Sequence, residues 1–315
     1  MLSLIVPVYG NEGSLSELLA AVTKLNDSLD GDFETVFVID ASPDNCYVLL
    51  RQLLPRQTFR SQLVLLSRNF GSFSAIRMGL QFARGQRFAV MAADLQEPPE
   101  LVLQMDEILR RDEADVVVGV REGRSDPTAS RLLSSAFWWL YRTYVIADVP
   151  PGGVDMFGCN RDFRDTLLRL EERHSSLIGQ LFWVGYRRSV VGYTRRERQH
   201  GRSGWTFTKK WKYLMDGVFS FTDLPIKLLI RIGVVGTALA AVLVLLLAAG
   251  RVSGVIAVSG DAITMLVISL FGSLNLLGLG IVGVYAWRTY ENTKQRPNAI
   301  PRQSHVFEGT HADQH

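Results

Sequence analysis

The stretch RFAVMAADLQEPPE (residues 87–100) displays most clearly how the chain alternates between strand and helix. Its apolar run is bounded by polar residues and prolines, which is typical of a buried strand, and helical spacing follows over residues 99–110. Asp94 comes at the end of the apolar run, where an acid has little use in packing. We therefore expect Asp94 to bind a metal ion, although position 92, where such a site usually has a second acid, is Ala.

Four other apolar runs share this pattern, and helix-like stretches such as residues 15–22 and 74–83 lie between them. The runs are residues 2–9, 34–40, 61–69 and 114–121. Alternating strands and helices, with strands that are apolar nearly throughout, predict an α/β domain with a mostly parallel sheet covered on both faces. In such sheets, ligands bind beyond the carboxyl ends of the strands.

Polar residues lie at or just beyond the carboxyl end of each of the five runs, where a ligand is expected. They are Tyr9, Asn11, Glu12, Asp40, Asp44, Arg68, Asn69, Asp94, Gln96 and Arg121. Acids at two strand ends suit a nucleotide and a metal. Asp40 would accept hydrogen bonds from a base or ribose, and Asp94 would hold Mg²⁺ or Mn²⁺, which prefer oxygen ligands and bridge phosphates. Arginines suit phosphate groups.

Two uncharged stretches, residues 232–250 and 262–287, are each long enough to cross a membrane as a helix. A pair of buried core helices is the alternative. The short loop between them predicts a hairpin whose outer ends lie on one side of the membrane. Those outer ends carry Lys and Arg, whereas the loop has only Arg251 and Asp261. The positive-inside rule therefore places the N-terminal part and both termini in the cytoplasm, at the inner membrane.

Residues 205–221 mix aromatic side chains with three lysines and lead toward the first span. We expect interfacial helices here, with aromatics in the lipid and lysines toward the headgroups. The longer run 187–212 has nine Lys/Arg against one acid, which suits a solvated surface, an anionic membrane or a phosphate ligand. The formal charge of the whole chain is only +3, and we expect no nucleic-acid partner. The polar tail after about residue 292 is expected to be disordered.

Several motifs occur in an order and spacing that resemble inverting glycosyltransferase family two. They are VPVYGNEGSL, VIDASPDN, LSRNFGSFSAIRMGL and ADLQEPPE, followed by GGVDMFGCNRD (152–162), LFWVGYRRSVVGYTRRERQHGRSGW (181–205) and FSFTDLPIKL (219–228). More narrowly, the chain resembles the polyprenyl-phosphate glycosyltransferases, which include dolichyl-phosphate mannose synthase and the bacterial bactoprenol-phosphate glucosyltransferases. The resemblance extends to about residue 290, because the bacterial members also end in a two-span hairpin.

The resemblance implies a cytoplasmic catalytic domain with the Rossmann-like GT-A fold over residues 1–204 and interfacial amphipathic helices over 205–226. A transmembrane hairpin over 227–290, with spans at about 229–250 and 262–287, and a polar tail over 291–315 would follow. It also implies inverting transfer of a sugar from a nucleotide diphosphate sugar to a membrane polyprenyl phosphate. The expected donor is UDP-linked, with GDP second. The expected cofactor is Mg²⁺ or Mn²⁺, and the expected assembly is a homo-oligomer, a tetramer by resemblance.

The family's site residues carry over onto matching positions of this sequence. Those matching the nucleotide site are Pro7, Tyr9, Glu12, Asp40, Arg68 and Asn69. Asp94 and Gln96 match the metal-binding motif, and Asp155 matches an acid beside the acceptor and sugar. Asp94 and Asp155 are therefore the expected catalytic residues. Those resembling the acceptor-phosphate and donor-diphosphate sites are Arg121, Arg131, Ser135, Arg195, Arg198 and Ser203.

Three positions depart from the family pattern: Ile39 and Ala92 stand where acids are usual, and Gly204 where a lysine is common. Each departure removes a polar or charged group, so we expect weak metal affinity before the nucleotide binds. One alternative function is a non-catalytic membrane subunit that binds nucleotide sugar or lipid phosphate, and another is a GDP-mannose-using enzyme like dolichyl-phosphate mannose synthase. A processive polysaccharide synthase is disfavoured, because its Q-x-x-R-W motif is not found.

Overall fold

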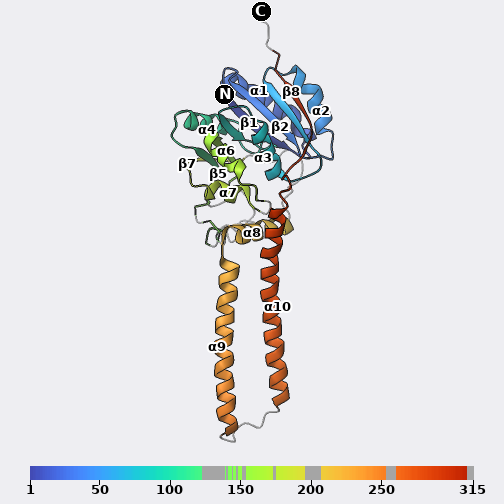
Figure 1. Cartoon of the computed structure of the whole chain (residues 1–315). Helices are drawn as coiled ribbons and strands as arrows, with labels where there is room; N and C mark the ends of the chain where they lie inside the picture. Colours follow the sequence, from blue (N-terminus) through green and yellow to red (C-terminus); the bar gives the residue numbers. More distant parts are fainter. Residues whose placement is uncertain are drawn as a thin grey trace, which may run out of the picture.

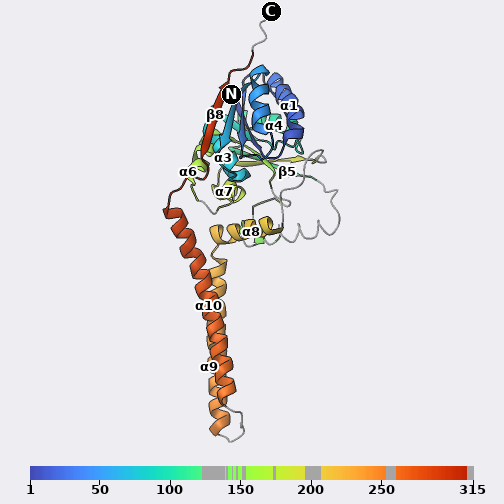
Figure 2. The same ribbon diagram turned by 90° about the vertical axis from the view of Figure 1, so that its right-hand side faces the viewer.

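The computed structural model describes residues 1–122, 139, 141–143, 145–146, 148–150, 154–172, 175–195, 207–252 and 260–310. In these residues an α/β domain is joined to two long helices, and a shorter helix lies across the junction (Figures 1 and 2). The centre of the domain is one eight-stranded sheet with the spatial order β7-β5-β6-β4-β1-β2-β3-β8. The strands are β1 (Leu2–Val8), β2 (Phe33–Ile39), β3 (Arg60–Leu66), β4 (Arg87–Val90), β5 (Val116–Arg121), β6 (Met156–Asn160), β7 (Arg188–Tyr193) and β8 (Pro301–Phe307).

The sheet is mixed. β3, β2, β1 and β4 are parallel neighbours, and β7 is parallel to β5. However, β6 runs antiparallel between β4 and β5, and β8 runs antiparallel to β3. The prediction of a mostly parallel sheet is therefore confirmed for β1 to β4, whereas the flanking strands β6 and β8 pair antiparallel and make the sheet mixed. Parallel neighbours need a crossover helix, which leaves a periodic pattern in the sequence, whereas antiparallel neighbours do not.

Helices cover both faces of the sheet, as the continuous apolar strands predict. One face packs against α1 (Leu15–Ser28), α2 (Cys46–Leu53) and α4 (Glu100–Arg110). The other packs against α3 (Ser72–Phe82), α6 (Arg161–Arg169) and α7 (Leu177–Trp183). Successive residues of a strand point to opposite faces, so Leu4 joins the first cluster and Ile5 the second. Both cores are thus built from the same buried strands.

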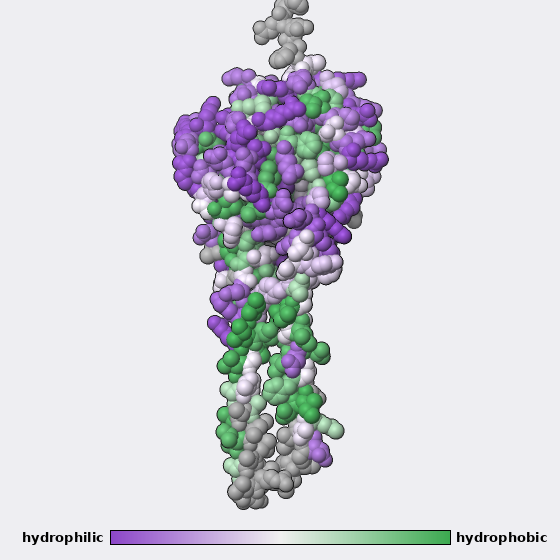
Figure 3. Space-filling model, viewed as in Figure 1, coloured by the Kyte–Doolittle hydropathy of each residue, from purple (hydrophilic) through white to green (hydrophobic). Residues whose placement is uncertain are grey.

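Two long helices, α9 (Leu224–Val252) and α10 (Gly260–Thr293), run side by side away from the domain in both ribbon views. Hydrophobic residues gather over them, whereas the visible surface of the domain is largely hydrophilic (Figure 3). Within the described residues, one stretch, Leu270–Thr293, is long and apolar enough to cross a membrane. That stretch overlaps the second predicted span, residues 262–287, and the two-span hairpin stays a prediction.

The helix α8 (Phe207–Phe221) connects the α/β domain to the long helices. Gly179 of α7 leaves no room for a side chain, because an added Cβ would lie 2.4 Å from the Phe221 ring. On its other side, Arg288 of α10 donates from Nη2 to Asp216 Oδ1 at 2.8 Å and packs over the Phe219 ring. Packing and an ion pair therefore fix α8 against both parts of the molecule.

The predicted disorder of the polar tail is wrong over residues 301–307, which form β8. His305 lies opposite Leu63 of β3, and the Tyr47 hydroxyl donates to Gln303 Oε1 at 2.6 Å. The sequence PRQSHVF gives little sign of a strand. An open sheet edge supplies unpaired backbone groups to any segment brought beside it, so pairing overrides the weak local preference.

Candidate active site

The carboxyl ends of the parallel strands face the two long helices. The chain leaves α10 at Thr293 and enters β8 at Pro301 (Figure 1). Just before β8, the Ile300 carbonyl accepts a hydrogen bond from the Ser67 amide, directly after β3. Because β8 is antiparallel to β3, the carboxyl end of β3 is the end nearer to α10. Ligands of open α/β sheets bind at this edge.

Asp94 lies in the loop that follows β4, four residues past the end of the strand at Val90. The next residue, Leu95, has a φ of 52°, in the left-handed region that non-glycine residues rarely adopt. This turn brings the Gln96 amide to Asp94 Oδ1 at 3.4 Å. The Gln96 side-chain oxygen in turn accepts from Arg195 Nη2 at 2.6 Å. A strained backbone of this kind is a recurrent feature of functional loops.

Asp155 accepts two hydrogen bonds from the ends of neighbouring strands. Arg121 of β5 donates from Nη2 at 3.0 Å, and the Tyr193 hydroxyl of β7 donates at 2.6 Å, both to Oδ2. Burial raises the pKa of the Tyr193 hydroxyl far above its usual range, and the charge of Asp155 raises it further. Tyr193 is therefore a permanent proton donor, and Asp155 is an anionic acceptor that orients two neighbours. Tyr193 is not among the site residues predicted from the sequence.

Glu97 was also not singled out, although it lies within the quoted motif. Its side chain is only 2% exposed. Oε1 lies 3.6 Å from Arg195 Nη2, and Oε2 has no hydrogen-bond partner among the described residues. Burial raises the pKa of Glu97 to about 7; the negative charges of Asp155 and Asp94 also raise it, whereas Arg195 lowers it. Glu97 thus lies within electrostatic reach of the predicted catalytic acids.

Asp40 lies at the end of β2 and binds the loop that follows β3. It accepts hydrogen bonds from the backbone amides of Phe70 at 2.7 Å and Gly71 at 2.8 Å, one on each carboxylate oxygen. Burial raises the pKa of Asp40, and the two amide hydrogen bonds oppose that rise. The loop held in this way carries the exposed residues Arg68 and Asn69. Direct contact of Asp40 with a base or ribose stays a prediction.

Acids in the loops after β1 and β2 hold these two loops together by hydrogen bonds. Glu12 accepts from the Asn45 backbone amide at 3.0 Å, and Asp44 accepts from the Glu12 amide at 3.0 Å. Beside these two loops, the Tyr9 side chain is 52% exposed, and its contact with a nucleotide stays a prediction. Pro7, which pairs with Val38 of β2, is half-buried. The predicted nucleotide residues thus gather at the carboxyl ends of β1, β2 and β3.

Residues 3–192 match the model of glycosyl transferase family 2. The chain belongs to glycosyltransferase family 2. An uncharacterized glycosyltransferase of Synechocystis sp., sll0501, is 30% identical over 94% of this chain and 93% of its own length. The undecaprenyl-phosphate 4-deoxy-4-formamido-L-arabinose transferase of Pseudomonas paraeruginosa is 31% identical over 94% and 88%. A prophage bactoprenol glucosyl transferase homolog of Escherichia coli is 28% identical over 95% and 97%. The protein is thus a family 2 glycosyltransferase enzyme.

The metal site expected of this family 2 enzyme is sparse. Within the part of the chain that the structure describes, no group of three His, Cys, Asp or Glu side chains is placed to hold a metal ion. Asp94 offers a half-buried carboxylate, and the Gln96 oxygen is already bonded to Arg195. This donor set fits Mg²⁺ or Mn²⁺ bound by one carboxylate, waters and substrate phosphate oxygens, and it does not fit a metal held by protein alone.

Four predicted residues of the family 2 site lie outside the described residues. They are Arg131, Ser135, Arg198 and Ser203, and their roles stay predictions. The structure joins the others into groups through the contacts above. Asp94, Gln96 and Arg195 form one group, and Arg121 with Asp155 forms a second. Glu97 interacts with both groups, since the negative charges of Asp94 and Asp155 both raise its pKa.

Proposed function

We propose that this family 2 glycosyltransferase moves a sugar from a nucleotide diphosphate sugar to a polyprenyl phosphate, with inversion at the anomeric carbon. The names of two relatives support a polyprenyl-phosphate acceptor: one is an undecaprenyl-phosphate transferase and another a bactoprenol glucosyl transferase homolog. The donor is proposed to be a UDP-sugar. Which sugar it carries depends on contacts that no single motif defines.

One observation carries the proposal: the edge of the sheet that gathers the acids and arginines faces the long apolar helices. The Ile300–Ser67 hydrogen bond fixes this orientation, and α8 lies between the two parts. A lipid phosphate at the membrane surface is therefore on the same side of the domain as Asp94, Asp155 and Arg195. A soluble acceptor would need no such arrangement.

The proposed chemistry is a single in-line displacement. A phosphate oxygen of the acceptor bonds to the anomeric carbon as the bond from that carbon to the donor diphosphate breaks, and the nucleoside diphosphate leaves with the electron pair. A phosphate monoester has a second pKa near 6, so the acceptor is already largely anionic at neutral pH and needs no strong base. This agrees with Asp155, whose Oδ2 is occupied by two donors.

The larger demand is the charge that grows on the leaving diphosphate. Arg195 and Arg68 are the described cations at the site edge suited to bind it, because guanidinium groups pair well with phosphate oxygens. Asp94 would hold the divalent metal ion, which when bound stabilises negative charge on the diphosphate. Arg121 and Tyr193 hold Asp155 in place beside the sugar or acceptor.

We also propose that α9 and α10 form a two-span hairpin with the catalytic domain in the cytoplasm. Leu239 on α9 and Leu276 on α10 are typical of the many large apolar side chains that these helices expose. Exposed apolar surface of this extent favours burial in lipid. The cations cluster at the outer ends of the two helices, which favours a cytoplasmic domain: Lys227 and Arg231 lie near the start of α9, and Arg288 and Lys294 lie at the end of α10.

A donor screen tests the proposal. Membranes containing the protein are incubated with a short-chain polyprenyl phosphate, Mg²⁺ and each common UDP- or GDP-sugar, and lipid products are identified by mass spectrometry. We expect one UDP-sugar to give a polyprenyl-phosphate sugar of inverted anomeric configuration. Failure with every donor would refute the proposal. Transfer of the donor sugar to a polysaccharide, and not to the lipid, would identify a different acceptor.

A further inference from the structure

Glu97 is a buried carboxylate at the site edge with no role in the reaction described so far. It lies between the Asp94 loop and α4, and its side chain is 2% exposed. A buried carboxylate is costly unless a cation or hydrogen bonds compensate it. Such a residue needs a compensating partner, and Arg195 is the cation that the structure places beside it.

Among the residues that the structure describes, the side-chain contacts of Arg195 are made through one guanidinium nitrogen, Nη2. Its Nη2 donates to Gln96 Oε1 at 2.6 Å and lies 3.6 Å from Glu97 Oε1. Its Nε is buried and has no hydrogen-bond partner among the described residues. Arg195 lies two residues past the end of β7, so its backbone stays close to the strand, while residues 96 and 97 contact its guanidinium. A guanidinium bound through one nitrogen keeps donors for a second, anionic partner.

We propose that Glu97 is a positioning residue for sugar transfer: with Gln96, its carboxylate holds the Arg195 guanidinium beside the Asp94 loop, where that guanidinium binds the diphosphate of the donor. This inference rests on the proposed function. Without the charge of Glu97, Arg195 would be drawn toward the carboxylates of Asp94 or Asp155, which would place it wrongly for a phosphate. The displaced Arg195 would then also block the carboxylates of Asp94 or Asp155.

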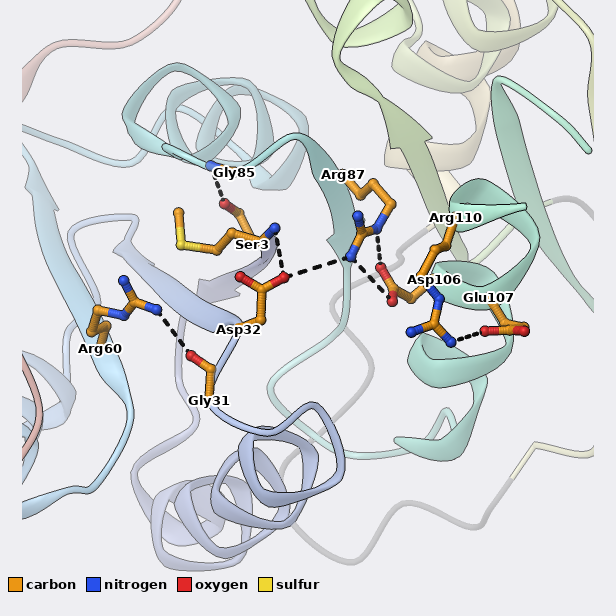
Figure 4. A network of polar contacts seen from close by, with 10 residues as sticks. Ser3, Gly31, Asp32, Arg60, Gly85, Arg87, Asp106, Glu107 and Arg110 are labelled. Atoms are coloured by element: carbon orange, nitrogen blue, oxygen red, sulfur yellow. Dashed lines mark hydrogen bonds and ion pairs between the residues drawn. The ribbon is translucent and has the colours of Figure 1, made fainter. Parts of the chain in front are cut away.

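A second buried acid–arginine pair provides a matched comparison. Asp106, in the second half of α4, accepts from Arg87 Nε at 2.6 Å and is 3% exposed. This pair lies at the amino end of β4, away from the proposed site (Figure 4). Both acids are buried and both face an arginine, so the two pairs share a structural role. Only the Glu97 pair is expected to affect donor binding.

The test compares Glu97→Gln, Glu97→Ala, Arg195→Ala and the double variant Glu97→Gln/Arg195→Ala with the parent, in membranes, under saturating acceptor. KM for the donor sugar and kcat are measured, and folded protein is quantified by thermal melting in detergent. We expect Glu97→Gln to raise the donor KM on the order of tenfold, a coupling typical of residues in contact. The double variant should match Arg195→Ala, since Glu97 acts through Arg195.

Asp106→Asn serves as the control, with a lower melting temperature and an unchanged donor KM. If Glu97 has only a structural role, its replacement should reduce the amount of active enzyme and leave the donor KM unchanged. The losses of activity in Glu97→Gln and Arg195→Ala should then be independent and should multiply in the double variant. If the parent is active, either result refutes the role of Glu97 but leaves the proposed function intact. A parent that transfers no sugar refutes the proposed function itself. If Glu97→Ala fails to fold, the isosteric Glu97→Gln decides.

Discussion

The amino edge and the carboxyl edge of the central sheet, where its parallel strands begin and end, differ in how completely their buried charged groups are bonded. At the amino edge, acids are matched to donors: Asp32 binds the Met1 amino group at 2.8 Å, and Asp106 binds Arg87. Glu34 accepts from Ser3 at 2.6 Å and from the backbone of Arg84. At the carboxyl edge, buried atoms lack hydrogen-bond partners among the described residues, namely Glu97 Oε2, Arg121 Nε and Arg195 Nε.

Left-handed backbone occurs at both edges, since Asp30 precedes β2 and Asp112 precedes β5. Ala41 and Leu95, with φ of 49° and 52°, each come directly after a strand-end acid, Asp40 or Asp94. Left-handed non-glycine residues cost about 1 kcal/mol or more and persist where the surrounding structure imposes them. What distinguishes the carboxyl edge is a set of buried charged groups, Glu97, Arg121 and Arg195, with atoms that a ligand can still bind, whereas the acids of the amino edge are bonded to donors within the fold. Mutations at the two edges should consequently differ in kind.

The largest expected effect is at Asp94. Asp94→Asn removes the carboxylate charge from the loop after β4, and we expect transfer to fall by at least about a hundredfold, as when a group that stabilises transition-state charge is lost. Melting temperature should change little, because Asp94 is only half-buried. Initial rates of lipid-product formation over a Mg²⁺ titration measure the effect. Parent-like rates at every Mg²⁺ concentration would remove Asp94 from the mechanism.

Asp106→Asn should instead reduce stability by about 2 kcal/mol, the usual scale for a hydrogen bond that involves charge. The amide cannot balance the Arg87 charge, but it can keep one hydrogen bond. Chemical denaturation of the detergent-solubilised protein gives the change, and kcat per folded molecule is the companion measurement. A large loss of kcat with intact stability would mean that the two edges are not functionally distinct.

Tyr193→Phe should lower turnover roughly tenfold, because loss of one hydrogen bond to a charged group is worth about 1.5 kcal/mol. Arg121 remains to hold Asp155, so the effect should be smaller than at Asp94. The ring packs in the core, and the variant keeps it, so the melting temperature should stay close to that of the parent. Turnover under saturating substrates is the measurement. No change would show that Asp155 needs only Arg121.

The smallest effect is expected at Asp32, whose side chain is exposed. Its hydrogen bond with the Met1 amino group holds the pKa of Asp32 below its usual value. A lowered acid pKa stabilises the fold above the unfolded-state pKa, near 3.9, and this contribution disappears as pH falls through the folded-state value. Asp32→Asn should therefore cost less than about 1 kcal/mol near neutrality. Melting curves of parent and variant should converge in acid; a constant difference would contradict the pairing.

The sequence predicts the elements well where patterns are local. The apolar runs at residues 2–9, 34–40 and 61–69 correspond to β1, β2 and β3 within a few residues. The acids Asp40 and Asp94 are also found beyond strand ends, because burial excludes unpaired charge from the strands. The strand β8 was missed, since pairing with an open edge depends on a neighbour distant in sequence.

The sequence by itself determined the alternation of strands and helices, the family, and the positions at which polar residues leave the strands. Periodicity and motif order record these directly. Only the tertiary structure decided that Asp40 binds the loop after β3, that Tyr193 donates to Asp155, and that Glu97 faces Arg195. The reason is physical: the charge state and role of a buried group depend on its burial and on charges from other strands, and a one-dimensional pattern contains neither.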